Sequence, residues 1–107
     1  MGFFDFLRQP DVNQGVSDYK NTVGAVLIDV RTPEEYSQGH IPESRNVPLQ
    51  TLDRVVTFVK NKDTELFVYC HSGARSRQAA AMLGRMGYTR VNNIGGLSSY
   101  RGMVERY

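Results

Sequence analysis

Apolar residues in this chain gather into short runs that polar segments separate. Two runs, residues 25–30 and 65–69, are continuous and rich in β-branched and aromatic residues, which is typical of strands buried on both faces. A shorter run predicts a third strand over residues 90–94. Helical spacing of apolar positions, or helix-capping residues, predict helices over residues 11–21, 32–39, 49–61, 76–86 and 97–105.

Capping residues support two of these helices, and a glycine weakens one of them. Thr32 is placed as an N-cap, with Pro33 at the first helical position and Glu35 completing a capping box. Asp11 is placed to cap the first helix, although Gly15 in its interior weakens that prediction. The segments left over are interpreted as connections: an extended one over residues 40–48 and a turn at Gly95–Gly96.

The alternation of strands and helices predicts the α/β class, with a compact and mainly parallel sheet. In such sheets, binding groups gather beyond the carboxyl ends of the strands. Asp29 and Arg31 stand at the end of the first predicted strand, and Cys70 follows the second. We therefore expect these three side chains to share one rim of the sheet, although they lie far apart in the sequence.

Length, charge and cysteine content narrow the class of protein. The 107 residues fit a single domain, residues 1–107, with residues 1–11 as an N-terminal extension. A net charge of +2 is too mild to indicate nucleic-acid binding. One cysteine excludes an internal disulfide and favours a reducing compartment, so we expect a cytoplasmic protein. The sequence has no Cys/His cluster with zinc-ligand spacing.

The apolar N-terminal segment, residues 1–7, leaves two interpretations open. Asp5 interrupts it, and no run in the chain approaches the length of a membrane span. It lacks a basic leader and a small-residue cleavage site, so we expect no signal peptide. Phe6 stands where a myristoylation motif needs Ser or Thr. The segment either packs its Phe side chains on the domain or contacts a membrane surface or a partner.

The residues that are best suited to catalysis form a polar turn between a predicted strand and a predicted helix. Unpaired N–H groups and the helix dipole make such a turn an anion site. Cys70 opens the turn, so its thiol should ionise readily among these donors and near Arg75. Gly73 allows a tight turn, and Ser72 and Ser76 add hydroxyl groups. A thiolate here can attack electrophilic sulfur, phosphorus or carbonyl carbon; the alternative is a buried structural cysteine.

The sequence also resembles the rhodanese family of sulfurtransferases. The family loop, Cys-x-x-Gly-x-Arg-Ser/Thr between a strand and a helix, matches residues 70–76. Three more family motifs match in order: Asp-x-Arg-x-x-x-Glu-Tyr at residues 29–36, Gly-His-Ile-Pro-x-Ala-x-Asn at 39–46 and Gly-Gly-x-x-x-Trp at 95–100. Ser44 stands where Ala is usual and Tyr100 where Trp is usual. Both departures are conservative and are expected to affect packing rather than chemistry.

The resemblance implies helices on both faces of the sheet and a sulfur-transfer mechanism. Cys70 is implied as the nucleophile: its thiolate takes the outer sulfur of an anionic donor such as thiosulfate as a persulfide. Cyanide, a thiol or a sulfur-carrier protein then accepts that sulfur. No metal or organic cofactor, nucleic acid or membrane span is implied, and a monomer or weak dimer is expected. The residues implied to bind the donor are His71, Ser72, Gly73, Ala74, Arg75 and Ser76.

Three residues outside the loop are interpreted as supports for it. Asp29 and Arg31 are expected to form an ion pair that fixes the strand end and supports the Cys70 loop, with direct substrate contact by Arg31 as the alternative. His40 is expected to be a hydrogen-bonded structural histidine rather than a proton donor. Whether His71 takes part in catalysis is left open.

Two rival functions belong to proteins of related type. Cysteine phosphatases and arsenate reductases of rhodanese type carry five residues between Cys and Arg, whereas four separate Cys70 from Arg75. Rhodanese-like modules that only bind partners usually lack the cysteine. The C-terminal half is also rich in arginine. These side chains either lie on solvated faces or create a mild positive field that attracts anionic donors or an acidic carrier. They are Arg75, Arg77, Arg85, Arg90 and Arg101.

Overall fold

The computed structural model describes residues 10–107, and its centre is a four-stranded sheet in which every paired strand is parallel. The order is β2-β1-β3-β4, and the strands are β1 (Val26–Asp29), β2 (Arg45–Asn46), β3 (Leu66–Cys70) and β4 (Val91–Gly96). Since β1 and β3 are neighbours, their carboxyl ends meet at one rim, as the sequence predicted. The expectations for the apolar N-terminal segment lie outside the described residues.

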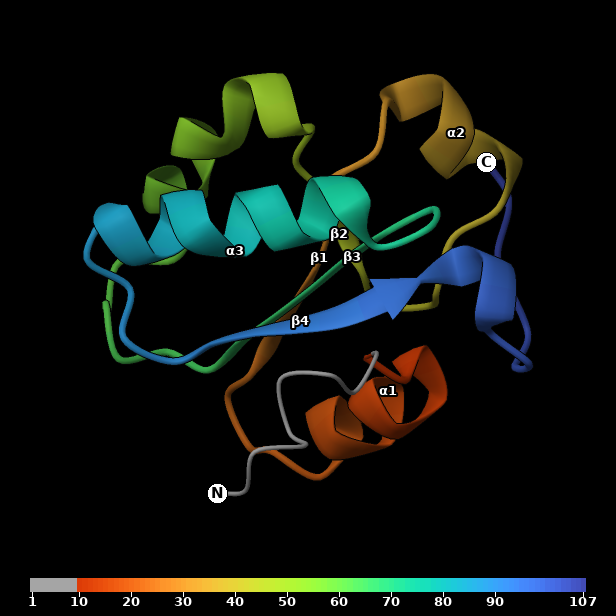
Figure 1. Ribbon diagram of the computed structural model, residues 1–107, viewed down its shortest axis with the longest axis horizontal. Coiled ribbons are helices and arrows are strands. Elements are labelled where there is room, and N and C mark those ends of the chain that lie inside the picture. Colours follow the sequence, from red (N-terminus) through yellow and green to blue (C-terminus); the bar gives the residue numbers. More distant parts are fainter. Residues whose placement is uncertain (1–9) are drawn as a thin grey trace.

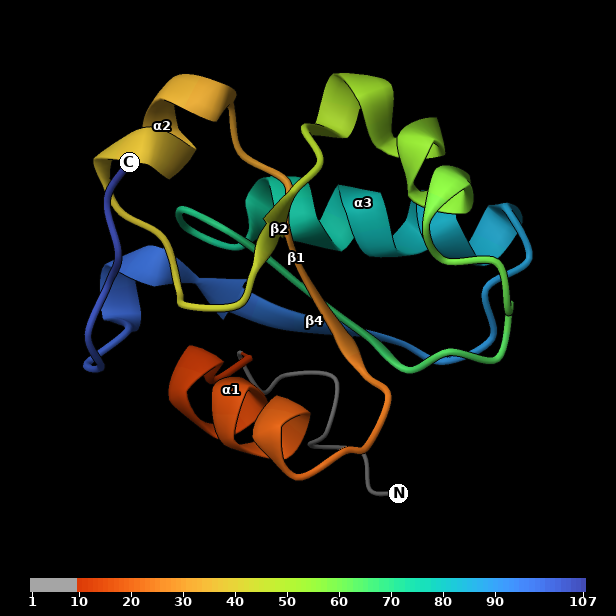
Figure 2. The ribbon, with the colours of Figure 1, turned by 180° about the vertical axis from the view of Figure 1, so that it is seen from behind.

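Helices cover both faces of this sheet, which confirms the expected α/β class (Figure 1; Figure 2). The helix α3 (Ala74–Arg85) and the 3-10 segment η2 (Leu49–Thr57) lie on one face, and α1 (Val12–Lys20) lies on the other. The short α2 (Pro33–Gln38) stands beside the C-terminus of the chain. Within residues 10–107, none of the helices has the length and apolar character that a membrane crossing requires.

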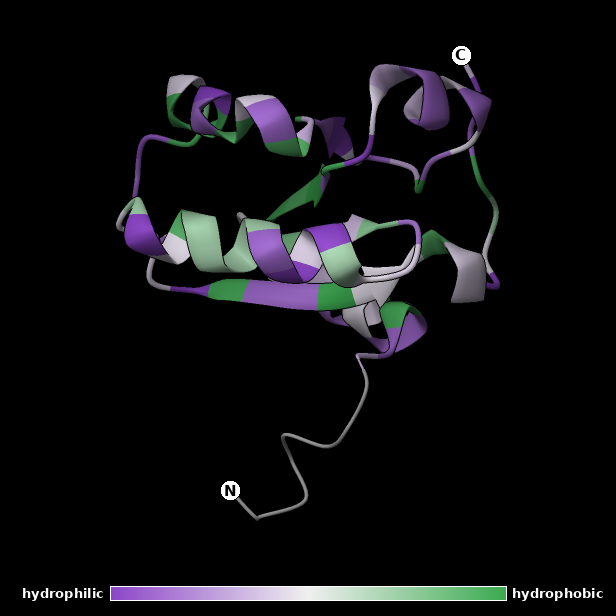
Figure 3. Ribbon diagram, turned by 45° about the horizontal axis from the view of Figure 1, so that its top comes forward, coloured by the Kyte–Doolittle hydropathy of each residue, from purple (hydrophilic) through white to green (hydrophobic). Residues whose placement is uncertain are grey.

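Alternating residues of the central strands supply two separate cores. Ile28 and Val68 pack in the cluster that includes α3 and η2, whereas Leu27 and Phe67 pack with α1. Successive side chains of a strand point to opposite faces, so a strand covered on both sides is apolar throughout. In Figure 3, the helix α3 carries both hydrophilic and hydrophobic residues, as expected for a helix that packs one face on a sheet. This two-sided burial explains the continuous apolar runs.

The capping residues act as the sequence predicted. The Asp11 carboxylate accepts hydrogen bonds from the backbone N–H groups of Asn13 and Gln14 at the start of α1. Thr32 and Glu35 form a reciprocal capping box at the start of α2. These interactions lie within four residues along the chain, so the sequence alone can specify them.

Gly15, which weakened the prediction of the first helix, is required by packing. A Cβ atom at this position would lie 2.3 Å from the Cβ of Ile94 in β4. The missing side chain therefore allows α1 to approach the sheet closely. This close packing opposes the cost of the glycine in helical propensity.

The helix predicted over residues 49–61 is wrong in type and length. The structure has the 3-10 segment η2 there, and Thr51 interrupts it with φ −125° and ψ 34°. Leu52 and Val55 still face the core, because a spacing of three residues returns to the same side in a 3-10 helix as well. The extended connection over 40–48 also contains β2, which pairs with β1.

The final helix predicted over residues 97–105 is also wrong. Only the single 3-10 turn Leu97–Ser99 forms, and the chain then runs back to the region of α2. There Glu105 and His40 exchange backbone hydrogen bonds of 2.9 Å in each direction. Gly95 and Gly96 end β4 and pair with β3, so they are not the predicted turn. Both errors concern partners that are distant in the sequence.

Candidate active site

Cys70 is the last residue of β3, and the turn that follows folds back over its sulfur. The N–H groups of Gly73 and Ser76 point at the Cys70 Sγ, with N to S distances of 3.0 and 3.3 Å. Gly73 has φ +106°, a left-handed conformation that glycine adopts without strain, and it is the N-cap of α3. The helix therefore begins at Ala74, two residues before the predicted start, with its free N–H groups around the sulfur.

This environment favours the thiolate form of Cys70. Burial raises the pKa of the Cys70 thiol, since the side chain is almost fully enclosed. Hydrogen bonds from the Ser76 hydroxyl and from the backbone N–H groups of Ser76, Gly73 and Ser72 outweigh burial, so the net pKa lies below the ordinary value. The readily ionised thiol that the sequence predicted is thus produced by hydrogen bonds.

Arg75 has a partner that the sequence interpretation did not identify. Its two terminal nitrogens bind the two carboxylate oxygens of Glu35 in α2, at 2.7 and 3.0 Å. The Arg75 guanidinium holds the pKa of the Glu35 carboxyl at about 2, and Glu35 in turn raises the pKa of Arg75. The pair fastens the first turn of α3 to α2, and it leaves backbone N–H groups as the nearest donors to the sulfur.

Ser76 is fully buried beneath the loop, where it connects Cys70 to β4. Its Oγ lies 3.5 Å from the Cys70 Sγ and 2.7 Å from Oδ1 of Asn93. Asn93 was missed by the sequence interpretation. It lies in a strand next to another asparagine, and nothing in the local pattern distinguishes the two.

The end of β4 supports the loop from below. A Cβ atom on Gly96 would lie 2.2 Å from the carbonyl oxygen of His71 and 2.7 Å from the Cα of Ser72. The Ser98 N–H donates to the same His71 carbonyl at 3.0 Å. Gly96 therefore allows the backbone of β4 to touch the backbone of the Cys70 loop, a contact that a side chain at this position would prevent.

The remaining loop side chains lie at the surface, between two hollows. His71, Ser72 and Ala74 are exposed. One hollow of about 550 Å3 lies on the β4 side of the loop, where Ser72, Arg77 and Asn93 are among its lining residues. The other, of about 390 Å3, lies on the α2 side and includes His71. The described residues thus form a hollow on each side of the loop.

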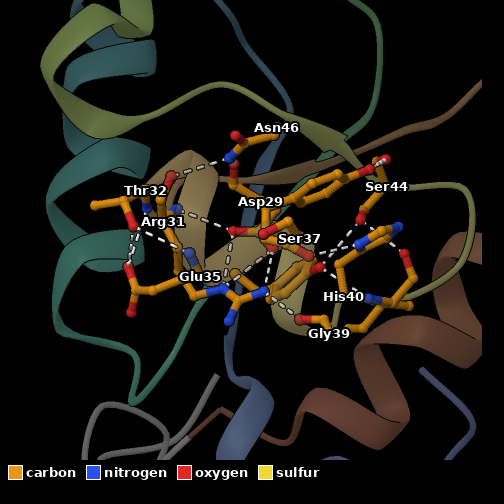
Figure 4. A network of polar contacts seen from close by, with 12 residues as sticks. Asp29, Arg31, Thr32, Glu35, Ser37, Gly39, His40, Ser44 and Asn46 are labelled. Carbon is orange, nitrogen blue, oxygen red and sulfur yellow. Dashed lines mark hydrogen bonds and ion pairs between the residues drawn. The ribbon is translucent and has the colours of Figure 1, made fainter. Parts of the chain in front are cut away.

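Asp29 and Arg31 form the expected ion pair at the end of β1 (Figure 4). The Arg31 Nη2 lies 2.7 Å from a carboxylate oxygen of Asp29 and donates to the Gly39 carbonyl at the same distance. Both side chains are buried. Asn46 donates from its amide to the backbone carbonyls of Asp29 and Arg31, which ties β2 to the same point. Arg31 also lines the hollow on the α2 side of the Cys70 loop.

His40 is buried and packed among aromatic rings. Its Nδ1 lies 2.7 Å from the Tyr36 carbonyl oxygen, and its ring stacks on the Tyr36 ring at 3.7 Å between centroids. Its Nε2 lies 3.7 Å from a carboxylate oxygen of Glu105 and has no hydrogen-bond partner within residues 10–107. His40 is thus hydrogen-bonded, as expected, and its structural role stays a prediction.

Ser44, one of the two departures from the family pattern, has more than a packing role. Its hydroxyl donates to the Ile41 carbonyl at 2.7 Å and lies 3.0 Å from the hydroxyl of Tyr69, which precedes Cys70. The Ile41 N–H donates to the same Tyr69 hydroxyl at 3.0 Å. Burial raises the pKa of Tyr69, so the hydroxyl stays neutral. Tyr69 is thereby satisfied inside the core that α1 covers.

The described residues offer no metal site, since no three His, Cys, Asp or Glu side chains within residues 10–107 are grouped as ligands. The groups that the structure places at the end of β3 are the Cys70 sulfur and the hydrogen-bond donors around it. A nucleophilic thiolate with hydrogen-bond donors fixed around it can carry out a covalent group transfer.

Comparison with known families gives one match that spans most of the chain. The family described as the rhodanese-like domain matches residues 12–102. This range includes the Cys70 loop, both ends of the central strands and the segment of β4 beneath the loop.

Similar sequences and structures carry sulfurtransferase names. Thiosulfate sulfurtransferase PspE of Escherichia coli is 46% identical over 71 residues, which are 65% of this chain and 68% of PspE. A sulfurtransferase of Allochromatium vinosum is 41% identical over 71% of this chain and 70% of its own. A solved structure of an E. coli rhodanese with anions aligns with a TM-score of 0.73 at 39% identity, over 78% of this chain and 99% of that one.

Proposed function

The chain belongs to the rhodanese family, and on that premise we propose that it is a thiosulfate sulfurtransferase that carries sulfur as a persulfide on Cys70. The observation that carries the role of Cys70 is the direction of the donors around it. The N–H groups of Gly73 and Ser76 donate hydrogen bonds to its sulfur. These bonds favour the thiolate that is needed to attack the sulfur of a donor.

The proposed reaction has two covalent steps. The Cys70 thiolate attacks the outer sulfur of thiosulfate, a new S–S bond forms, and the old bond breaks as sulfite leaves with its electron pair. The negative charge then resides on the outer sulfur of the persulfide. An acceptor such as cyanide attacks that outer sulfur, the S–S bond breaks, thiocyanate leaves, and the Cys70 thiolate returns. Charge and sulfur balance in both steps without a cofactor.

The loop residues have different proposed roles. The backbone from His71 to Ser76 would hold the outer sulfur and the anionic part of the donor, because its free N–H groups surround the sulfur. The exposed side chains of His71, Ser72 and Ala74 would meet the donor and acceptor at the surface. Arg75 would act mainly through its pair with Glu35, which fixes the start of α3, and only secondarily as a direct donor to the anion.

The proposed setting follows from the same chemistry. A thiol or a sulfur-carrier protein would be the natural acceptor, and a reducing compartment such as the cytoplasm would keep the lone thiol free. A monomer or weak dimer and a single domain remain predictions. Analytical ultracentrifugation across a range of protein concentrations would measure the first of these.

Intact-mass spectrometry tests the proposed function directly. Incubation with thiosulfate should add the mass of one sulfur atom, and cyanide should then remove it. Peptide mapping should place the sulfur on Cys70, and Cys70→Ser should show no addition. The absence of any adduct with thiosulfate and with a small organic persulfide would overturn the proposal. Turnover of an aryl phosphate that Cys70→Ser abolishes would instead indicate a cysteine phosphatase.

A further inference from the structure

The Ser76 hydroxyl has a single proton and several possible acceptors. Its Oγ lies 2.7 Å from the Asn93 Oδ1, 3.1 Å from the Gly73 carbonyl, 3.3 Å from the Gly95 carbonyl and 3.5 Å from the Cys70 Sγ. When Cys70 is a thiolate, all four neighbours are acceptors. Ser76 is fully buried beneath the loop. The proton can serve only one of them well at a time.

Asn93 is the acceptor best placed to compete with the sulfur. It makes the shortest of these contacts, and its Oδ1 also accepts the Gly95 N–H at 3.1 Å. That second bond fixes the amide oxygen toward the loop. Asn93 lies in β4, at the point where the pairing of β3 and β4 shifts register. The β4 strand therefore presents a fixed acceptor to the hydroxyl that reaches Cys70.

The need of the Cys70 sulfur for a proton donor changes during sulfur transfer. In the free enzyme Sγ carries the negative charge, so a hydrogen bond from Ser76 stabilises it. In the persulfide the charge has moved to the outer sulfur, and Sγ becomes a weak, neutral acceptor. During transfer to the acceptor, Sγ is the leaving group and regains the charge. A donor that could turn toward Sγ at that moment would ease the step.

We propose, on the basis of the proposed function, that Asn93 is a positioning residue for sulfur transfer. It holds the Ser76 proton while the Cys70 sulfur is neutral in the persulfide. It yields that proton to Sγ when the S–S bond breaks and the thiolate forms. No covalent bond to Ser76 or Asn93 is made or broken; the hydroxyl only rotates between two acceptors. Asn93 thereby sets how strongly the resting thiolate is stabilised.

The thiolate content of the variants tests this proposal without a sulfur donor. Ultraviolet absorbance and the rate of iodoacetamide alkylation follow the ionisation of Cys70, the only cysteine in the chain, across pH. Asn93→Ala removes the competing acceptor, so at a pH where the wild-type thiol is mostly protonated the thiolate fraction should rise about threefold, the effect of one modest hydrogen bond. Arg75 and Glu35, the charged pair beside the loop, are unchanged in this variant.

A second variant and two controls separate positioning from structural effects. Asn93→Asp has the same shape, is a stronger acceptor and adds a negative charge, so it should lower the thiolate fraction, and more strongly with Ser76 present than in a Ser76→Ala background. In a Ser76→Ala background, Asn93→Ala should have no effect on ionisation, because the group that connects Asn93 to the sulfur is gone. Asn92→Ala is the matched control: it also loses two side-chain hydrogen bonds, to Glu65 and Leu66, but none to the loop. It should leave ionisation unchanged.

The rates of the two half-reactions, persulfide formation and sulfur release, provide a further test. A purely structural role of Asn93 would change both rates alike. Release of sulfur from preformed persulfide to cyanide should accelerate in Asn93→Ala relative to persulfide formation from thiosulfate, because the leaving thiolate is better stabilised. An unchanged thiolate fraction, or the same change in the Ser76→Ala background, would overturn the proposal. If Asn93→Ala does not fold, the difference between the effects of Asn93→Asp with Ser76 present and with Ser76→Ala decides the question: equal effects would overturn the proposal. Failure to form any persulfide would refute the proposed function but would leave the ionisation test intact.

Discussion

Two neighbouring strand ends of this molecule use polar groups in opposite ways. At the end of β1, Asp29 and Arg31 are buried, and both carboxylate oxygens are occupied by the guanidinium. At the end of β3, Cys70 is also buried, but backbone N–H groups and one hydroxyl converge on its sulfur. One region is a closed ion pair, and the other is a thiol, the proposed nucleophile, with hydrogen-bond donors around its sulfur.

The difference suggests different roles for the two strand ends at one rim of the sheet. A paired and buried ion pair gains nothing from a ligand, because its charges are already compensated. A thiolate held by hydrogen bonds keeps a reactive lone pair. Changes at the end of β1 should therefore affect stability, whereas changes at the end of β3 should affect chemistry. The following four variants test this division.

Replacing Arg31 should cause the largest loss of stability. Arg31→Met leaves the Asp29 carboxylate buried without its partner, and such losses are about 3–5 kcal/mol in the free energy of unfolding. Urea unfolding measures the change. The double variant Asp29→Asn with Arg31→Met should recover part of the loss, because the unpaired charge is gone. A loss under about 1 kcal/mol, or complete loss of sulfur transfer in the folded variant, would contradict the division.

Adding one methyl group beneath the loop should reduce activity more than stability. In Gly96→Ala the new Cβ would clash with the His71 backbone, and relief of that clash must move the Cys70 loop. We expect about 1–3 kcal/mol of destabilisation and about 100-fold slower sulfur transfer. Gly84→Ala in α3 is the control, because a Cβ there meets no atom within 4 Å and a helix favours alanine. Equal activities of the two variants would show that loop position matters little.

Removing the Ser44 hydroxyl should affect stability modestly and chemistry not at all. Ser44→Ala loses hydrogen bonds to the Ile41 carbonyl and the Tyr69 hydroxyl, while the Ile41 N–H still donates to Tyr69. The expected cost is about 1 kcal/mol, measured by thermal unfolding. The rate of persulfide formation should equal that of the wild type. A marked fall in that rate would mean that the support around Tyr69 reaches the adjacent Cys70.

The Glu35–Arg75 pair should make the smallest contribution, and only above acidic pH. The pKa of Glu35 is lowered from 4.5 to about 2 in the folded protein, so its contribution is present above about pH 4.5 and is lost as the pH falls toward 2. The pair is about one-third exposed, so solvent screening limits it to less than about 1 kcal/mol. Unfolding in urea from pH 7 to 2 measures this contribution.

Glu35→Gln should remove this part of the pH dependence while it keeps the capping box, since glutamine also fits that position. Glu34→Gln in the same turn is the matched control, because its carboxylate forms no ion pair within residues 10–107. The same acid dependence in wild type and Glu35→Gln would show that the pair does not stabilise the fold.

Local patterns were sufficient for most of the fold. The continuous runs at β1 and β3 were predictable because a strand covered on both faces must be apolar at every position. The starts of α1 and α2 were predictable because each cap bonds to residues within the next three. The segments 49–57 and 97–107 were not, because a 3-10 helix shares the apolar spacing of an α-helix and the last residues pair with the region around His40.

The features of the candidate site were likewise predictable in part from the sequence. The position of Cys70, the tight turn at Gly73 and the early start of a helix lie within seven consecutive residues, and the sequence predicted their combined effect on the thiol. The partner of Arg75 was not predictable, since Glu35 lies in another helix and already had a local role as a capping residue. Asn93 was not predictable either, because its contact with Ser76 depends on the register of β4 beside β3.

The sequence by itself thus determined a thiol at the end of a buried strand, among the free donors of a helix start, because those features depend on neighbouring residues. Only the tertiary structure decided which groups outside the loop act on it. Glu35 binds Arg75, Gly96 lets the loop backbone lie directly on β4, and Asn93 accepts a hydrogen bond from Ser76. Each of these contacts joins elements far apart in the chain, and the packing of helices and strands alone brings them within bonding distance.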